Sequence, residues 1–482
     1  MEALSVFDML KIGVGPSSSH TLGPWRAVQR WLGELDDAGL LGGVERVQVH
    51  LYGSLALTGR GHCTDQAIAL ALLGHDPVTI AVDRIPAYVA ALARDKRVVL
   101  GGAAVAFDPA ADILYHPSER LPGHANGMTC VAVGGGADPA GSGAGERAST
   151  YYSVGGGFVV AEGEAERQAA GLVRLPHPAQ VPAELLAHCR SGACRIADVV
   201  QRNEEAWRTP AEVRARVLAL WDVMREGVFR GCHTDGVLPG GLGVARRAAP
   251  LARRLLGDAH EAETSREWIA AIRAQTFRFP QVLQLVSAFA LAVNEENANL
   301  GRVVTAPTNG AAGVIPAVLM YHVCFSDEEV TDDQIVDFLL VAGEVGTFFK
   351  KGATISAAMG GCQAEVGVSS SMAAAALCEA EGGTPEQAFQ AAEIAMEHHL
   401  GMTCDPIGGL VQIPCIERNT MGAVKAINAA HLALAGTPED ARVSLDAVIR
   451  TLRQTAEDMS DRYKETSQGG LATNVSVRFT EC

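Results

Sequence analysis

The sequence predicts an α+β protein, in which a smaller α/β domain is followed by a larger and mostly helical domain. Strand-like runs are concentrated in the first third of the 482-residue chain. A polar, charged and proline-bearing stretch follows them, as is typical of a linker. Helix-starting signals and helical periodicity dominate the remainder. We therefore expect a domain over 1–165, a linker over 166–182, a helical domain over 183–460 and a tail over 461–482.

The first domain shows both strand and helix signals. Val47, Val49 and Leu51 alternate with polar residues, which indicates a half-buried strand. The stretch 64–73 has a helical pattern and stops at Gly74, a typical helix C-cap. We expect a further helix over 23–32 and further strands at 97–100, 103–107, 128–133 and within 151–160.

Helix signals are frequent in the second domain. Two threonine–glutamine pairs have capping-box spacing, Thr331 with Gln334 and Thr384 with Gln387. Apolar residues recur at helical spacing over 445–452. The tail over 461–482 is rich in Thr, Ser, Gly and Asn and has no helical period, which is typical of a frayed terminus.

Charge and composition exclude several classes of protein. With 39 basic and 55 acidic residues, the formal net charge of −16 argues against binding to nucleic acid or to an anionic membrane. The longest apolar runs, near 282–293 and 313–325, fall short of the roughly 20 residues of a membrane span. The N-terminus lacks the pattern of a signal peptide. We therefore expect a soluble cytoplasmic protein, whose eleven cysteines are reduced and available for metal or redox chemistry.

The segment 11–21, which reads KIGVGPSSSHT, is the first candidate site. Its glycines permit unusual backbone angles, and hydroxyl and amide groups converge around Ser17, Ser18, Ser19 and His20. This composition favours an anion site for a carboxylate or a phosphate. The alternative is a plain turn whose serines cap the helix that follows. The segment lacks the Gly-Lys-Ser/Thr ending of a Walker A loop.

His62 and His124 each lie beside glycine and polar residues, in the segments GHCTD and HANGM. A histidine in such a setting could act as a general base or as a metal ligand. The alternative is a structural histidine whose ring is satisfied by its neighbours.

Cys362, Cys404 and Cys415 lie in turns that contain glycine or proline, whereas Cys378 lies in an alanine-rich helical pattern. A thiolate on a loop reaches a metal more readily, so the first three are the better ligand candidates. Their spacing fits neither a ferredoxin nor a zinc ribbon. Buried structural cysteines are the alternative interpretation.

Several segments together point to a family. They are residues 5–8, 11–21, 61–62 with 64–65, 124 with 126–128, 151–157, 294–297, 306–310, 401–428 and 463–472. The strongest block includes Cys404-Asp405-Pro406 and Pro414-Cys415-Ile416-Glu417-Arg418-Asn419. In this order the segments resemble the bacterial single-chain, iron–sulfur-dependent L-serine dehydratases (L-serine deaminases). The resemblance covers nearly the whole chain.

The resemblance implies conversion of L-serine to pyruvate and ammonia. It also implies a [4Fe–4S] cluster held by Cys362, Cys404 and Cys415, with one iron left open for substrate, in a pattern similar to aconitase. Such an iron makes the substrate hydroxyl a better leaving group. A neutral histidine suits removal of the Cα proton, and His62 is the first choice for this base, with His124 second or assisting.

The resemblance also implies the groups that orient the substrate and the arrangement of the domains. The expected substrate-binding residues are Ser17, Ser18, Ser19, His20, Asn126, Thr308 and Asn309. The first domain is similar to the regulatory domain of some phosphoglycerate dehydrogenases and is expected to pack on the helical catalytic domain, with the active site between them. The family further implies a homodimer.

The sequence ends in Cys482. A terminal cysteine offers a thiolate and an α-carboxylate, and in this family such a residue can enter the active site. The resemblance therefore implies that Cys482 is a fourth, displaceable cluster ligand and an autoinhibitory plug. Without the resemblance, a frayed end with an incidental thiol would be expected.

Two other functions are alternatives to the iron–sulfur lyase. A pyridoxal phosphate lyase is disfavoured because no Ser-x-Lys motif accompanies the glycines at 155–157. A non-catalytic amino-acid sensor would use the first domain while the cysteines only pack. The chain departs from the family pattern at 356–359, at Ala312, at Ala125 and at Cys63, which bears on substrate selectivity more than on cluster ligation.

Overall fold

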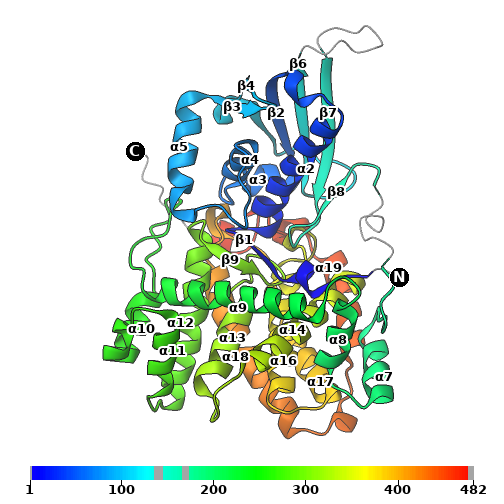
Figure 1. Cartoon of the computed structure of the whole chain (residues 1–482), viewed down its shortest axis with the longest axis vertical. Helices are drawn as coiled ribbons and strands as arrows, with labels where there is room; N and C mark the ends of the chain where they lie inside the picture. Colours follow the sequence, from blue (N-terminus) through cyan, green and yellow to red (C-terminus); the bar gives the residue numbers. More distant parts are fainter. Residues whose placement is uncertain (1–2, 135–144, 165–172, 476–482) are drawn as a thin grey trace.

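The computed structural model describes residues 3–134, 145–164 and 173–475, and these form two domains stacked along the long axis of the molecule (Figure 1). The upper domain is built on a seven-stranded sheet in the order β3-β4-β2-β6-β7-β8, with β5 also paired to β2. The strands are β2 (Val44–Tyr52), β3 (Arg97–Leu100), β4 (Ala103–Ala106), β5 (Ile113–His116), β6 (Gly127–Gly134), β7 (Gly145–Ser153) and β8 (Val159–Ala161).

Helices of the first domain bury the apolar residues of this sheet. They are α2 (Gly23–Asp37), α3 (Gly53–Thr58), α4 (Thr64–Leu72) and α5 (Ile85–Asp95), with a short α6 (Pro109–Asp112). Trp25 and Trp31 of α2 are fully buried in the same core as Val47, Val49 and Leu51 of β2. The alternation of β2 is thus explained by one face packed against helices. This confirms the predicted strand and the helices at 23–32 and 64–73.

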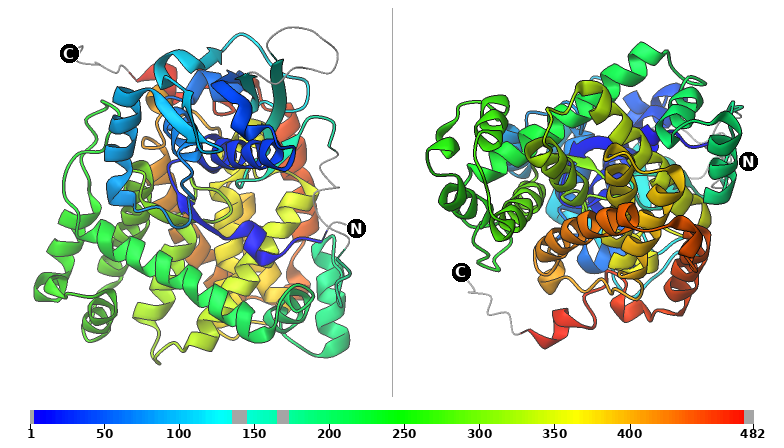
Figure 2. Two further views of the ribbon diagram at one scale, coloured as in Figure 1. Left: turned by 45° about the horizontal axis from the view of Figure 1, so that its top comes forward. Right: turned by 90° about the horizontal axis from the view of Figure 1, so that it is seen from below.

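The second domain is mostly helical, as predicted (Figures 1 and 2). Its helices are α7 (Pro182–Gly192), α8 (Ile196–Glu204), α9 (Pro210–Cys232), α10 (Ala248–Leu256), α11 (Ser265–Arg273), α12 (Phe279–Ala298), α13 (Val314–Phe325), α14 (Asp332–Gly352), α15 (Ala357–Gly360), α16 (Val366–Ala380), α17 (Pro385–Glu397), α18 (Cys415–Ala435), α19 (Leu445–Asp458) and α20 (Leu471–Asn474). Both predicted capping boxes are present, at the starts of α14 and α17.

The helix α16 forms the centre of this domain. Its alanines 373–376 are fully buried against neighbouring helices, because small side chains allow close approach. Three successive serines of α16 are also buried, and each donates to a carbonyl of a different neighbour. Ser369 donates to Ala311, Ser370 to Gly422 of α18, and Ser371 to Ala392 of α17. The hydroxyls of these three buried serines are therefore satisfied.

The two domains are joined through the first residues of the chain. After α1 (Val6–Met9), the strand β1 (Lys11–Val14) pairs antiparallel with β9 (Arg302–Thr305). This two-stranded sheet lies at the junction between the domains (Figure 1). The strand β9 was not predicted from the sequence. The buried carboxylate of Glu204 fixes the start of α1, since it accepts from the Val6 amide at 2.8 Å.

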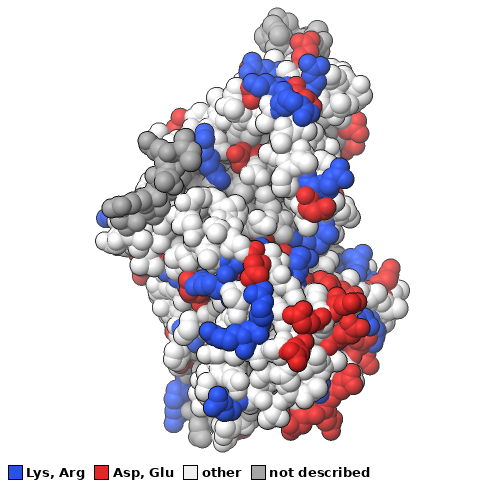
Figure 3. All heavy atoms as spheres, turned by 90° about the vertical axis from the view of Figure 1, so that its left-hand side faces the viewer, with Lys and Arg blue, Asp and Glu red and all other residues white. Residues whose placement is uncertain are grey.

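Among the described residues, no helix has the length and apolar character needed to cross a membrane. The face in Figure 3 carries both basic and acidic side chains, with acidic ones gathered at its lower right. The described part of this face shows no continuous basic stripe of the kind found at a nucleic-acid interface.

Candidate active site

The candidate site lies where the loop after β1, the helices α3 and α4, and the cysteine turns of the second domain meet residues 461–475. We call this last segment the C-terminal strap. The strap runs beside the turn that holds Cys404: the Cys404 amide donates to the Tyr463 carbonyl at 2.8 Å, and the Glu465 amide donates to the Cys404 carbonyl at 3.0 Å. The Ser467 hydroxyl donates to the Pro406 carbonyl at 2.7 Å.

The C-terminal strap also contacts the first domain. The Ser54 hydroxyl of α3 donates to the Glu465 carbonyl at 2.9 Å. Arg120 forms an ion pair with Asp461 at 2.7 Å. The strap is therefore held between the two domains, and the side chain of Glu465 lies at their junction.

His62, the predicted base, is fully buried beside His20. Their ring centroids are 4.5 Å apart and stacked. The Nδ1 of His62 lies 2.8 Å from the Thr58 carbonyl, which can only accept, so Nδ1 carries the proton and Nε2 of the neutral ring keeps a lone pair. Burial lowers the pKa of His62 to about 4, so the ring is neutral at pH 7.

Glu465 faces both histidines. Its Oε1 lies 3.5 Å from His62 Nε2 and 3.6 Å from His20 Nδ1, and its Oε2 is buried without a hydrogen-bond partner. Burial, followed by the negative charges of Glu365 and Cys362, raises the pKa of Glu465 above its usual value. The sequence interpretation named this segment in the family resemblance but did not identify the carboxylate as a site residue.

The predicted anion loop is buried next to the same histidines. The Ser19 hydroxyl lies 2.9 Å from His20 Nδ1 and the Ser17 hydroxyl lies 3.2 Å from that of Ser19. Ser17 also caps the helical turn at 18–22, because its hydroxyl accepts from the His20 amide at 3.1 Å. Ser17 thus caps this turn, whereas α2 itself has no side-chain cap at Leu22. The hydrogen bonds also place Ser17 and Ser19 beside the histidine pair.

Two of the predicted cysteine ligands are adjacent. The Sγ atoms of Cys362 and Cys404 and a carboxylate oxygen of Glu365 all lie within 4.8 Å of one another, and all three residues are buried. Cys415 is the first residue of α18 and is also buried. Burial, followed by the charge of Cys362, raises the pKa of Cys415.

The charge of Arg418 stabilises this group of thiols. Its guanidinium donates to Cys362 Sγ at 3.3 Å, to the Thr403 carbonyl at 2.6 Å and to Asp405 at 2.8 Å. A hydrogen bond from the Cys404 thiol and the positive charge of Arg418 lower the pKa of Cys362 to about 7, against the opposing effect of burial. A substantial fraction of Cys362 is therefore in the thiolate form near neutral pH.

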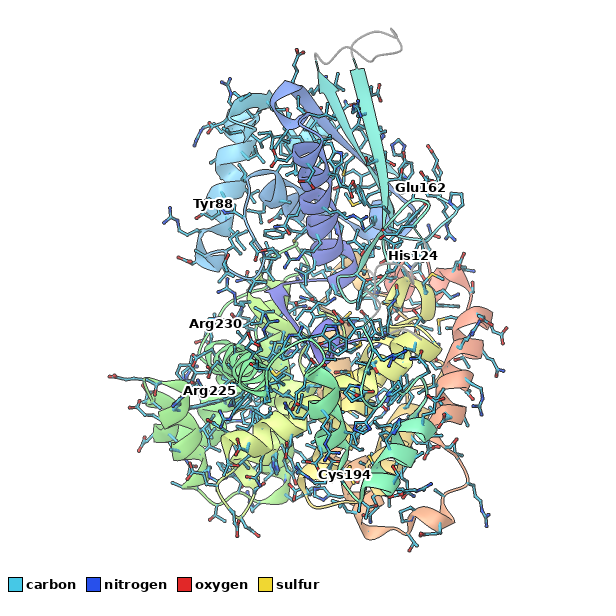
Figure 4. The ribbon with its side chains drawn as sticks, turned by 45° about the vertical axis from the view of Figure 1, so that its right-hand side comes forward. Tyr88, His124, Glu162, Cys194, Arg225 and Arg230 are labelled. Atoms are coloured by element: carbon cyan, nitrogen blue, oxygen red, sulfur yellow. The ribbon has the colours of Figure 1, made fainter. Side chains whose placement is uncertain are left out.

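His124 lies at the edge of the domain junction (Figure 4). It lines a cavity of about 400 Å³ together with Met359 and Lys464, the residue before Glu465. It is within electrostatic reach of His20, whose pKa is lowered first by burial, then by His62, and further by His124. The structure thus places His124 in a neighbouring cavity, whereas His62 is buried in the candidate site.

The remaining predicted site residues differ in their surroundings. The amide nitrogen of Asn126 donates to the Ser153 carbonyl at 3.3 Å, and its buried Oδ1 has no partner. The hydroxyl of Thr308 is likewise buried without a partner. The side chain of Asn309 is fully used: it accepts from Thr305 at 2.9 Å and donates to Asn297 at 3.0 Å. Asn309 therefore fixes the junction of β1 and β9.

Cys482 lies outside the described residues.

Comparison with known proteins gives the same order of domains. The family model described as "Serine dehydratase beta chain" matches residues 5–164, and the model described as "Serine dehydratase alpha chain" matches residues 191–472. The chain belongs to the serine dehydratase family. It is 48% identical over 476 residues to the L-serine dehydratase of Streptomyces coelicolor, with 98% of this chain and 99% of that protein covered.

Other members of the serine dehydratase family match as fully. The L-serine dehydratase TdcG of Escherichia coli is 45% identical over 474 residues, with 98% and 99% of the two chains covered. The L-serine dehydratase of Mycobacterium tuberculosis is 47% identical over 483 residues, with 99% and 100% covered. The family resemblance stated from the sequence motifs is therefore confirmed.

The structure adds four charged residues to the candidate site of this serine dehydratase family chain. They are Glu365, Asp405, Arg418 and Glu465, and the exposed fraction of each buried acid is below one tenth. A sequence signal exists for three of them, because Glu365, Asp405 and Arg418 each follow a candidate ligand cysteine within three residues. Glu465 is brought to the cysteines by the fold alone.

Proposed function

We propose that the chain is an L-serine dehydratase that converts L-serine to pyruvate and ammonia. The observation that carries the proposal is the meeting of a buried, neutral histidine from the first domain with a group of buried cysteines from the second. His62 Nε2 lies 3.5 Å from Glu465, whose backbone pairs with Cys404. This juxtaposition occurs in a chain that matches proteins named L-serine dehydratase along its whole length.

The residues present fit a [4Fe–4S] cluster. Cys362, Cys404 and Cys415 are buried and come from three separate turns, and Arg418 donates to Cys362 Sγ as a partner of a thiolate would. We propose that these three cysteines hold the cluster. When bound, it supplies an open iron that acts as a Lewis acid toward the substrate hydroxyl.

His62 is proposed to remove the proton from Cα. Its Nδ1–H is fixed on the Thr58 carbonyl, so Nε2 is the free base and faces the space occupied by Glu465. Proton transfer by a positioned base of this kind contributes about 10²- to 10⁴-fold to a rate. His124, which lines the neighbouring cavity, is proposed to assist.

The other predicted residues are proposed to orient the substrate. The hydroxyls of Ser17, Ser18 and Ser19 beside His20 suit a carboxylate. The unpartnered polar atoms of Asn126 and Thr308 are available to the substrate, whereas Asn309 acts by holding the loop that bears Thr308. Cys482 is proposed as the displaceable fourth ligand, and the approach of the C-terminal strap to Cys404 supports this proposal.

The atoms of the reaction balance without an oxidant. The Cα–H bond breaks with its proton going to His62, and the Cβ–O bond breaks with the hydroxyl leaving as water after it gains a proton. The product is an enamine, which tautomerises to an imine. Hydrolysis of the imine consumes one water and gives pyruvate and ammonia.

The proposal is tested by purifying the protein without oxygen and measuring iron, acid-labile sulfide and pyruvate formation from L-serine, D-serine and L-threonine. We expect a brown protein with broad absorbance near ~400 nm that bleaches in air. Pyruvate formed by a metal-free protein would overturn the cluster assignment. A protein inactive even after anaerobic reconstitution would favour the amino-acid sensor.

We also propose, from the family, that the protein is a cytoplasmic homodimer. Light scattering on the eluting peak of a gel-filtration column measures the mass directly. A mass near twice the 50.5 kDa of the chain is expected, and a mass equal to one chain would overturn the assignment.

A further inference from the structure

The helix α7 ends in a turn that brings two cysteines together. Ala193 is in the left-handed region, with φ 45° and ψ 49°, and it reverses the chain after the last helical residue. The amide of Cys194 then donates to the carbonyl of Cys189 at 3.1 Å. The amide of Ala193 donates to the carbonyl of Arg190 at 3.4 Å. These two hydrogen bonds define a Schellman motif, in which the residue after the left-handed one lies over the last turn of the helix.

The positions of Cys189 and Cys194 in this motif are ones whose side chains commonly contact each other. Because the two residues share a backbone hydrogen bond, their Cα atoms are held at about the separation found across disulfides, roughly 4.4–6.8 Å. The Sγ of Cys194 lies back over α7, since a Cβ added at Gly192 would be 3.0 Å from it. Both cysteines also pack on the same hydrophobic core. The pair therefore meets the backbone requirement for a disulfide.

The two thiols differ in their access to solvent. Cys194 is partly exposed, whereas Cys189 is only 2% exposed. Burial, followed by the charge of Cys194, raises the pKa of Cys189 to about 12. A soluble oxidant therefore reaches Cys194 first, and Cys189 lies behind it. The pair is separate from the candidate site, because Cys194 lies low in the helical domain whereas His124 lies at the domain junction (Figure 4).

We propose that Cys189 and Cys194 form a reversible disulfide by exchange with oxidised glutathione or a similar small disulfide. The thiolate of Cys194 attacks one sulfur of the oxidant, the S–S bond of the oxidant breaks, and one glutathione thiolate leaves. The thiol of Cys189 then loses its proton and attacks the Cys194 sulfur, which expels the second glutathione thiolate. Two protein thiols are oxidised and one small disulfide is reduced to two thiols, so no other reactant is needed. This modification site is independent of the proposed function.

The disulfide staples the connection between α7 and α8. The helix α8 begins two residues after Cys194, and its first two amides, those of Ile196 and Ala197, each donate to the buried carboxylate of Glu379 at 2.9 Å. Glu379 belongs to α16, the central helix of the domain. Oxidation therefore fixes a turn that is attached to the core of the helical domain.

Trypsin separates the two cysteines, because it cuts after Arg174, Arg190 and Arg195 and so places them in peptides 175–190 and 191–195. The anaerobically loaded protein is equilibrated in buffers of decreasing ratio of reduced to oxidised glutathione and is then alkylated. It is digested without reductant and examined by mass spectrometry. Cys189→Ser and Cys194→Ser are treated in the same way. Cys324, a buried cysteine of α13, is the matched control within each sample.

We expect most wild-type chains in oxidised glutathione to give the two peptides joined to each other, and few to do so after return to reduced glutathione. Cys324 should remain alkylated throughout. Cys189→Ser should retain glutathione on Cys194, because the resolving thiol is missing, and Cys194→Ser should leave Cys189 unmodified by glutathione. A wild type that keeps glutathione on Cys194 without joining the peptides would show that the sulfurs do not meet. A Cys194 that never reacts would show that the oxidant does not reach it, and either result would overturn the proposal.

Discussion

The guanidinium of Arg418 donates a hydrogen bond to the Sγ of Cys362 at 3.3 Å, although the two residues come from different turns of the helical domain. Arg418 is on the first turn of α18, three residues after Cys415, so both side chains are on the same side of this helix. One helix start therefore provides a candidate ligand and the positive charge that stabilises a second ligand.

Replacing Arg418 with Gln should make the cluster less durable. The variant loses the charge that favours the Cys362 thiolate and leaves Asp405 without its ion-pair partner. We expect the visible absorbance of the anaerobically loaded variant to bleach in air at least several-fold faster than that of the wild type. Arg418→Lys, which keeps the charge but not the planar fork, should lie between the two. Equal bleaching rates for all three proteins would contradict this role.

Each of the single changes Cys362→Ser, Cys404→Ser and Cys415→Ser should abolish bound iron and pyruvate formation, because three thiolates are proposed to hold the cluster. Iron content and visible absorbance check this directly. Cys378→Ala is the control, since Cys378 is buried in α16 away from the turns. Iron retained by the Cys404→Ser variant, or lost by the Cys378→Ala variant, would show that the ligand assignment is wrong.

His62→Gln should lower kcat by about 10²- to 10⁴-fold while the iron content stays at the wild-type value, because the variant loses the base but no ligand. Steady-state kinetics with L-serine and an iron assay separate the two effects. His50→Gln is a suitable comparison, since His50 lies on β2 and contacts His116 rather than the site. If His50→Gln and His62→Gln lowered kcat to the same extent, the assignment of His62 as the base would be wrong.

Acidification should destabilise the protein through its buried histidines. Burial lowers the pKa of His399 to about 4, whereas the unfolded chain has the usual value near 6.5. Between these pH values only the unfolded state binds the proton. The free energy of unfolding is therefore undiminished above pH 6.5 and falls as the pH drops toward 4. At pH 5 the loss in free energy of unfolding is about 2 kcal/mol.

Urea unfolding at pH 7 and pH 5 measures this effect. The free energy of unfolding of His399→Gln should fall less on acidification than that of the wild type, by about 2 kcal/mol. His20 and His62 titrate equally in both proteins and cancel in the comparison. Identical falls would mean that His399 is protonated in the folded state.

Asp405→Asn should loosen the C-terminal strap. One oxygen of Asp405 accepts from Arg418 at 2.8 Å, and the other accepts from the Leu471 amide at 2.7 Å. The variant keeps the shape but weakens both bonds, at a cost of about 1–3 kcal/mol. Hydrogen exchange of residues 461–475 should accelerate while that of α16 stays slow. A strap protected as in the wild type would contradict the anchoring role of Asp405.

Local patterns predicted the helices and most strands, because the signals that define them lie within a few residues. The capping boxes at Thr331 and Thr384 and the alternation of Val47, Val49 and Leu51 are examples. The short strands β1, β5 and β9 were missed. Each has four residues, too few to show a period, and β9 pairs with β1 at the far end of the chain.

Some residues of the candidate site could likewise be predicted from the sequence, and others could not. His62 and the three cysteines could be proposed from the sequence because they lie in turns with glycine and proline. Glu465 could not, since the tail lacks any periodicity and its place is fixed by backbone pairing with Cys404 and by the Ser54 hydroxyl. Such long-range backbone contacts have no signature in the residues that make them.

Because β1 pairs with β9 within one chain, the two domains stay together when the protein is diluted. The matched family descriptions name an alpha chain and a beta chain, but here both matches lie in a single polypeptide. A covalent connection keeps the two strands at an effective concentration of about millimolar, whatever the amount of protein present. Separate chains would have to associate before His62 could reach the turn of Cys404. In this protein the site is therefore assembled in every folded molecule, even at the lowest concentrations.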